Sequence, residues 1–252
     1  MGFSDSRVNW PLFFGCILIA FGPLATLFFV VVSKRAQLLI ISLFGAFIWL
    51  VSILLTATFW RVIPPLKDSI EATIPLGVVL QEASRFVFFH FYVRTEGAVQ
   101  KVTTATHQLP LNDVTSSIAK IRHSPYLLAA GVGYSLMHGL MMFGSVVGAS
   151  TGRRGAAFSL VPLVFASSLS ALALTVLDVA LMVVAFRGYR TRSIPLIGGV
   201  AVLHMVVAMS ALANKSTNGC YISIPVHYGG ALLACGAAIT CIKRSRATAA
   251  AS

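Results

Sequence analysis

Residues 38–60 read LLIISLFGAFIWLVSILLTATFW, a stretch of 23 positions without a charged side chain. A helix that crosses the hydrocarbon core of a bilayer needs about 20 mostly apolar residues, so this stretch is long enough to span a membrane. Six further runs of the same character lie at residues 13–32, 74–93, 126–149, 158–186, 194–212 and 222–242. Because open strands and irregular backbone are not tolerated in lipid, we expect an all-α, polytopic membrane protein with seven transmembrane helices.

The composition of the chain supports this fold class. Of the 252 residues, 57% are hydrophobic and 10% are charged, whereas soluble domains carry about 25% charged residues. The longest connection between the runs, residues 94–125, is rich in Thr, Ser and Gln and leaves no room for a separate soluble domain. We therefore expect one membrane domain over residues 1–252, with residues 94–125 as a cytosolic loop.

The lysines and arginines predict the orientation of the chain, because cytosolic loops carry an excess of them. With a lumenal or extracellular N-terminus and a cytosolic C-terminus, 12 of the 19 basic residues face the cytosol, six face outward and Arg85 lies within a run. The 12 are Lys34, Arg35, Arg94, Lys101, Lys120, Arg122, Arg187, Arg190, Arg192, Lys243, Arg244 and Arg246. The net charge of +12 would suggest nucleic acid in a soluble protein, but here it lies in separate loops, so no nucleic-acid partner is expected.

Polar side chains inside the runs are the candidates for a functional site, because such residues are costly in lipid. Glu82 and Arg85 are three residues apart and share one helix face, either as a structural ion pair or as a catalytic carboxylate with its orienting arginine. Counting along each run at the helical rise places the other polar residues near the same depth. We expect one buried cluster, in which Asp178 pairs with His204, formed by Gln81, Glu82, Arg85, His138, Asp178 and His204.

Small residues recur every four positions in the fourth run, at Gly131, Ser135 and Gly139. They lie on one face of the predicted helix, and small residues let helix backbones approach closely in a membrane. We therefore predict that this stripe packs against a neighbouring helix and supports assembly.

The runs do not hold a complete catalytic set. An aspartyl protease needs two membrane aspartates that share a proton, and Asp178 is the one aspartate within a run. Ser135 and His138, on one helix, are weak evidence for a serine mechanism. Seven runs without an evident repeat also argue against a transporter or channel. We expect no catalytic residue, no metal site and no cofactor.

Three motifs resemble the anterior-pharynx-defective (Aph) subunit family of gamma-secretase. They are Phe13-Phe14-Gly15-Cys16 followed by Phe21-Gly22-Pro23, Gly45-Ala46-Phe47-Ile48-Trp49-Leu50-Val51-Ser52, and Leu80-Gln81-Glu82-Ala83-Ser84-Arg85-Phe86. The resemblance covers nearly the whole chain, and His204 matches a histidine that the family carries in its sixth span. Two positions depart from the pattern: Ser135 replaces a glycine of the stripe, and Asp178 lies where the family has a histidine in its fifth span.

The resemblance implies a non-catalytic scaffold of an intramembrane aspartyl protease. Its implied partners are membrane lipids, a presenilin-type catalytic subunit, nicastrin and the presenilin-enhancer subunit. The implied locations are the endoplasmic reticulum, Golgi, endosomal and plasma membranes. The implied processes are protein processing and Notch signalling.

The alternative is an intramembrane protease of the CAAX-processing type. Such enzymes carry paired glutamates followed by an arginine, with histidines on later spans. Here Gln81 replaces the first glutamate, which leaves Glu82, Arg85 and the membrane histidines for catalysis. Losing one carboxylate removes half of a pair that would serve as general base or metal ligands.

Overall fold

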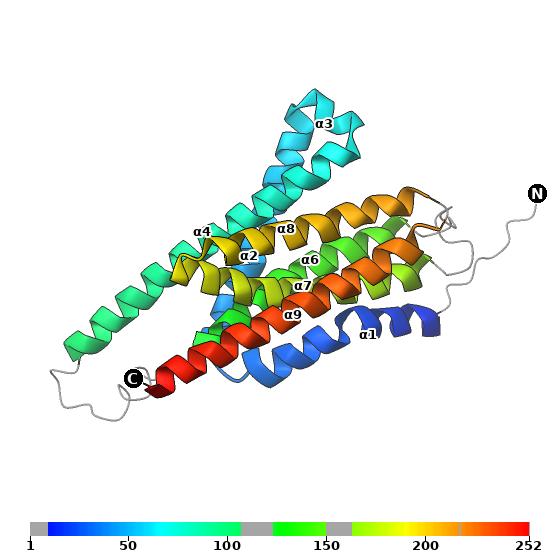
Figure 1. Ribbon diagram of the computed structural model, residues 1–252. Helices are drawn as coiled ribbons and strands as arrows, with labels where there is room; N and C mark the ends of the chain where they lie inside the picture. Colours follow the sequence, from blue (N-terminus) through cyan, green and yellow to red (C-terminus); the bar gives the residue numbers. More distant parts are fainter. Residues whose placement is uncertain (1–9, 107–122, 150–162, 217, 252) are drawn as a thin grey trace, which may run out of the picture.

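The computed structural model describes residues 10–106, 123–149, 163–216 and 218–251. All regular structure in these ranges is helical (Figure 1). Seven of the helical stretches are long and apolar enough to cross a membrane. The predicted all-α fold with seven transmembrane helices is confirmed, and the chain is an integral membrane protein.

The seven spans follow the seven predicted runs. The first two are α1 (Trp10–Leu27), extended by the π-helical turn η1 (Phe28–Val32), and α2 (Ala36–Val62). A short helix, α3 (Pro64–Asp68), leads to the third span, α4 (Ile70–Thr106). The others are α6 (His123–Ala149), α7 (Leu163–Thr191), α8 (Ile194–Ser210) with the 3₁₀ turn η2 (Ala211–Lys215), and α9 (Cys220–Ala251).

The connection between the third and fourth spans is shorter than the predicted loop 94–125. α4 has 37 residues and continues to Thr106, while α6 begins at His123. At the helical rise, α4 is roughly 55 Å long, which exceeds the ~30 Å thickness of the hydrocarbon core. The polar end of α4 therefore extends out of the membrane as a helix, residues 107–122 lie outside the described ranges, and the cytosolic location stays a prediction.

α7 lies at the centre of the bundle (Figure 1). It contacts α1, α4, α6, α8 and α9 and contributes residues to all three apolar clusters of the core. Its sequence alternates large apolar residues with Ala, Ser and Gly, and many of these side chains are buried. Small side chains let several helices approach α7 at once, which a uniformly bulky helix would prevent.

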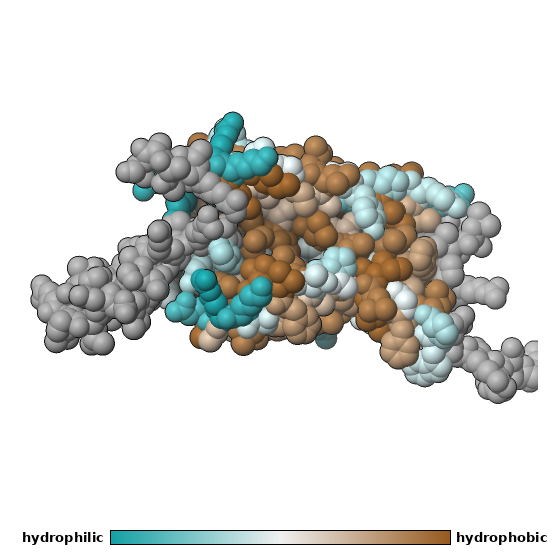
Figure 2. Space-filling model, turned by 90° about the horizontal axis from the view of Figure 1, so that it is seen from below, coloured by the Kyte–Doolittle hydropathy of each residue, from teal (hydrophilic) through white to brown (hydrophobic). Residues whose placement is uncertain are grey.

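The outside of the bundle is apolar around its middle. Figure 2 shows hydrophobic residues over most of the face in view, with the most hydrophilic residues gathered near one end. Large exposed apolar side chains occur on many helices, among them Leu18, Phe47, Val79, Val202 and Leu232. Such a surface is unstable in water and stable in hydrocarbon, as a membrane span requires.

The orientation predicted from the basic residues can be tested at the hairpin of α2 and α4, whose closed end at α3 projects past the other helices (Figure 1). A polar insertion that carries a glycosylation sequon, placed after Asp68, should give a glycosidase-sensitive mass shift. The same insertion within residues 107–122 should give none, because that segment is predicted to face the cytosol. Glycosylation of the protein with the insertion in residues 107–122, and not of the one with the insertion after Asp68, would show that the chain has the opposite orientation.

The natural sequon at Asn214 is a poor reporter of this topology. The Ser223 hydroxyl donates a hydrogen bond of 2.8 Å to Asn214 Oδ1, and Asn214 lies in the turn η2 between two spans. We expect this asparagine to stay unmodified in either orientation, so it serves as an internal control for the two insertions.

Candidate functional site

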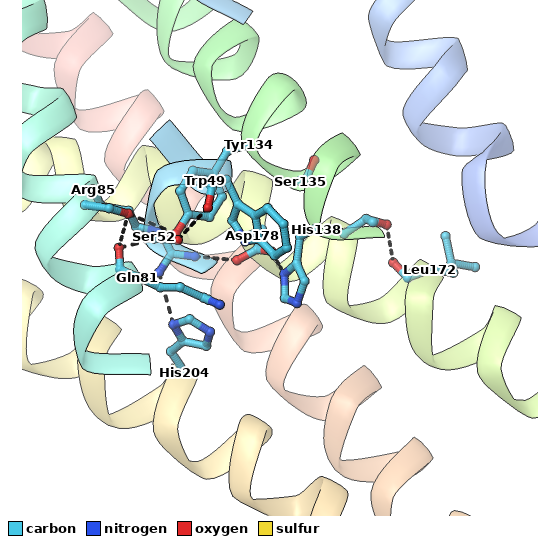
Figure 3. A network of polar contacts seen from close by, with 12 residues as sticks. Trp49, Ser52, Gln81, Arg85, Tyr134, Ser135, His138, Leu172, Asp178 and His204 are labelled. Atoms are coloured by element: carbon cyan, nitrogen blue, oxygen red, sulfur yellow. Dashed lines mark hydrogen bonds and ion pairs between the residues drawn. The ribbon is translucent and has the colours of Figure 1, made fainter. Parts of the chain in front are cut away.

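Arg85 is the centre of a buried charge network between the helices (Figure 3). Its side chain is completely buried. Nη1 forms an ion pair with Glu82, one turn earlier on α4, and Nη2 forms an ion pair with Asp178 on α7. A buried charge is costly unless it is paired and hydrogen-bonded, and the planar guanidinium has donors for both carboxylates. One arginine therefore compensates two anions in the interior.

Each carboxylate also has a histidine as a partner. His138 Nδ1 on α6 lies 2.5 Å from Asp178 Oδ2, and His204 Nδ1 on α8 lies 2.5 Å from Glu82 Oε1. With a hydrogen on Nδ1, each imidazole donates to its carboxylate. The network thus connects α4, α6, α7 and α8 through side-chain contacts alone.

The predicted pairing of Asp178 with His204 is wrong. Asp178 contacts His138 and Arg85, whereas His204 contacts Glu82 and lies 3.2 Å from Arg85 Nη1. The guanidinium therefore lies between the two expected partners. Depth along each helix placed both residues at the right level, but depth carries no information on how the helices are ordered around the bundle.

Mutant cycles can distinguish the two pairings. His138→Ala and Asp178→Ala should couple by about 0.6 kcal/mol or more, the average for hydrogen bonds inside membranes, because each single change leaves a buried polar partner unsatisfied. Asp178→Ala and His204→Ala should couple less, since Arg85 separates those side chains. Thermal unfolding of the wild type, single and double variants in detergent gives both energies. Coupling confined to the second pair would contradict the structure.

Two aromatic residues that sequence reasoning missed enclose the network. The ring of Tyr134 on α6 is completely buried and lies 5.0 Å from Arg85 Cζ, in the arrangement of a cation–π contact. Trp49 on α2 stacks on His138, with ring centroids 5.1 Å apart and an interplanar angle of 23°. Tyr134 is four residues before His138, so helical spacing from the network histidine was the signal that could have found it.

Gln81 joins the site through its backbone. Its carbonyl oxygen accepts hydrogen bonds from the hydroxyls of Tyr134, at 3.3 Å, and Ser84, at 2.7 Å. The side-chain oxygen of Gln81 is buried and has no hydrogen-bond partner among the described residues. The six residues predicted to cluster therefore lie together, with Gln81 as the one member outside the side-chain charge pairs.

The predicted stripe of small residues on α6 faces helices of the same chain. A Cβ added at Gly131 would lie 3.0 Å from Val179 Cα on α7, and one at Gly139 would lie 2.7 Å from Thr175 Cγ2. Ser135 between them is fully buried, and its hydroxyl donates to the Val132 carbonyl at 3.2 Å. The stripe thus packs α6 against α7, and a role in assembly with other subunits stays a proposal.

Glycine contacts closer than those of the stripe lie on the other side of α6 and were not predicted. A Cβ at Gly133 would overlap the backbone of Ser42 on α2, and a Cβ at Gly45 would lie 2.5 Å from the Ala130 carbonyl oxygen. Gly45 and Gly133 therefore let α2 and α6 meet backbone to backbone. Trp49, one turn after Gly45, is brought onto His138 by this close approach.

Two substitutions in the stripe test whether close packing of α6 against α7 stabilises the protein. Gly131→Leu should cost about 1–3 kcal/mol, because the new side chain meets the backbone of Val179, which cannot rotate away. Ser135→Gly should cost less than about 1 kcal/mol, chiefly the weaker helix propensity of glycine. Thermal unfolding measures both, and a wild-type midpoint for Gly131→Leu would show that the two helices are not in contact there.

Comparison with known proteins shows which family the chain belongs to. The sequence pattern of the family described as Aph-1 protein matches residues 11–245. The chain belongs to the Aph-1 family. The resemblance inferred from the three motifs is therefore confirmed.

Individual relatives cover most of the chain. A protein of Arabidopsis thaliana named gamma-secretase subunit APH1-like is 29% identical over 223 residues, which are 85% of this chain and 86% of that protein. The Drosophila melanogaster protein named gamma-secretase subunit Aph-1 is 26% identical over 210 residues, 82% of each chain. The human gamma-secretase subunit APH-1B is 27% identical over 150 residues, 56% of this chain and 54% of its own length.

Proposed function

We propose that this chain is the Aph-1 subunit of a gamma-secretase-type complex and acts there as a scaffold without catalytic residues of its own. The family match over residues 11–245 carries this proposal. The partners follow from the composition of such a complex: a presenilin-type catalytic subunit, nicastrin and the presenilin-enhancer subunit. The endoplasmic reticulum, Golgi, endosomes and plasma membrane are the corresponding locations.

The charge network supports a structural role. An aspartyl protease needs two carboxylates close enough to share one proton. Here the Arg85 guanidinium lies between Glu82 and Asp178 and binds both of them. Two carboxylates held as anions by one cation are suited to fastening helices and unsuited to alternating as acid and base.

The same contacts weigh against the CAAX-type alternative. Its residues do come together, since Glu82, Arg85 and the two histidines lie in one network. However, each histidine directs Nδ1 at a carboxylate, and the guanidinium lies between the two acids and pairs with both of them. The relatives are named as gamma-secretase subunits and not as CAAX-type proteases, so the alternative is set aside.

Affinity purification from gently solubilised membranes tests the proposal. The tagged chain should recover presenilin-type and nicastrin-type proteins, identified by mass spectrometry. The Gly131→Leu variant should recover less of both, while Gly144→Ala, on the same helix but with open space around it, should recover wild-type amounts. Recovery of neither partner, together with cleavage of peptides by the purified chain alone, would contradict the scaffold role.

A further inference from the structure

Five basic side chains form a rim at one end of the bundle. This basic rim consists of Lys34, Arg35, Arg187, Arg192 and Lys243. They come from three separate segments: the α1–α2 turn, the end of α7 with the α7–α8 turn, and the end of α9. All three segments lie at the same end of the molecule (Figure 1). The rim therefore lies where the apolar surface of several spans ends.

The rim is not neutralised by the carboxylates whose side chains the structure describes. Asp68 and Glu71 lie at the opposite end, near α3, where Glu71 pairs with Lys215. Glu82 and Asp178 are occupied by Arg85 in the interior. Four of the five rim residues are exposed and Arg187 is half-buried, so their charges face the surroundings.

Arg192, one of the rim residues, lies in a backbone conformation that glycine usually adopts. Arg192 has φ of 51°, in the left-handed region that favours glycine. It caps α7 in a turn in which Ser193 N–H donates to the Gly188 carbonyl at 2.9 Å and Arg192 N–H donates to the Tyr189 carbonyl at 3.3 Å. Glycine is the usual residue at this position of such a cap. Arginine there introduces backbone strain and adds a positive charge at the level of the rim.

We propose that the basic rim binds the headgroups of anionic phospholipids in the leaflet that it faces. Basic residues at a membrane surface attract anionic lipid, each by an amount that corresponds to roughly five-fold in affinity. A lipid surface fits better than an acidic protein segment, because the charges come from three segments at one depth and do not form a single compact patch. The proposal does not depend on the chain's role in a protease complex.

Native mass spectrometry of the full chain, with the subunits that co-purify, tests the proposal. Wild-type protein offered equal phosphatidylserine and phosphatidylcholine should retain phosphatidylserine preferentially, and the preference should fall with salt. Lys34→Gln combined with Arg35→Gln should weaken retention of phosphatidylserine at least several-fold. The matched control, Arg61→Gln combined with Lys67→Gln at the opposite end, should retain the wild-type preference.

Arg192→Gly distinguishes lipid binding from a purely structural role. Glycine relieves the backbone strain, so thermal stability in phosphatidylcholine nanodiscs should be unchanged or higher. The additional stability that wild-type protein gains from phosphatidylserine should shrink in this variant. Equal preference of wild-type protein for both lipids, or an equal loss in the control, would overturn the proposal. Loss of co-purifying subunits from the rim variants with unchanged lipid preference would also overturn it and assign the rim to a protein partner.

Discussion

Arg85→Leu should remove most of the folding stability of the chain. The substitution leaves the buried carboxylate of Asp178 and the half-buried carboxylate of Glu82 without the cation that both of them contact. Breaking a buried ion pair by removing one partner costs about 3–5 kcal/mol. Since proteins are stable by only about 5–15 kcal/mol, little folded protein should accumulate. Abundance in membranes and the thermal midpoint of the purified protein measure the effect.

Companion variants show whether charge or shape causes this loss. Adding Glu82→Gln and Asp178→Asn to Arg85→Leu should restore part of the stability, because the uncompensated charges are then gone. Arg61→Leu, at an exposed position near the end of α2, should stay within about 0.5 kcal/mol of wild type. An Arg85→Leu protein that unfolds at the wild-type temperature would show that the carboxylates do not rely on this arginine.

Gly133→Ala should be the most damaging of the glycine substitutions on α6. The added methyl would overlap the carbonyl of Ser42, which is backbone, so no side-chain rotation can relieve the contact. Either α2 moves away from α6 or both helices distort, at a cost of about 1–3 kcal/mol or more. Separation of the helices would also withdraw Trp49 from His138. Thermal unfolding of the purified protein measures the loss.

Two other glycines of the same helix give a graded series. Gly139→Ala would meet Thr175 Cγ2 at 2.7 Å and Phe21 Cε1 at 3.1 Å, and both atoms belong to side chains that can adjust. Gly144→Ala meets nothing within 4 Å, so it should be neutral or stabilising by helix propensity. The expected order of stability is Gly144→Ala, then Gly139→Ala, then Gly133→Ala. The reverse order would show that α2 and α6 are not in contact at Gly133.

The spans were predictable from sequence because hydrophobicity and length alone determine which helices can cross a membrane. The level of the polar cluster was predictable for a related reason: each helix adds a fixed rise per residue from the membrane surface. The residue count from the membrane surface therefore predicts one depth for Glu82, His138, Asp178 and His204. The end of α4 at Thr106 could not be derived from the sequence, because the Thr-rich composition before it carries no apolar pattern.

Helix order around the bundle could not be derived from the sequence. Hydrophobic residues face both lipid and neighbouring helices, so apolar patterning does not distinguish the two environments. For this reason the sequence does not identify His138 as the partner of Asp178. It also does not show that Gly133, outside the regular stripe, makes the closer helix contact. Trp49 was not predicted because an aromatic residue in an apolar run has no distinctive spacing of its own. Tyr134 was not predicted although it lies four residues before His138 on the same helix. Their importance follows from contacts between helices that are distant in sequence.

Cleavage by a reconstituted complex tests the scaffold account most directly. Presenilin-type, nicastrin-type and presenilin-enhancer subunits should cleave a membrane-protein substrate only when this chain is added. The complex with the variant Glu82→Gln, corrected for the amount assembled, should cleave at the wild-type rate, because a structural carboxylate takes no part in the cleavage step. Cleavage by the purified chain alone, or a complex that assembles fully with Glu82→Gln and yet cleaves nothing, would contradict the account.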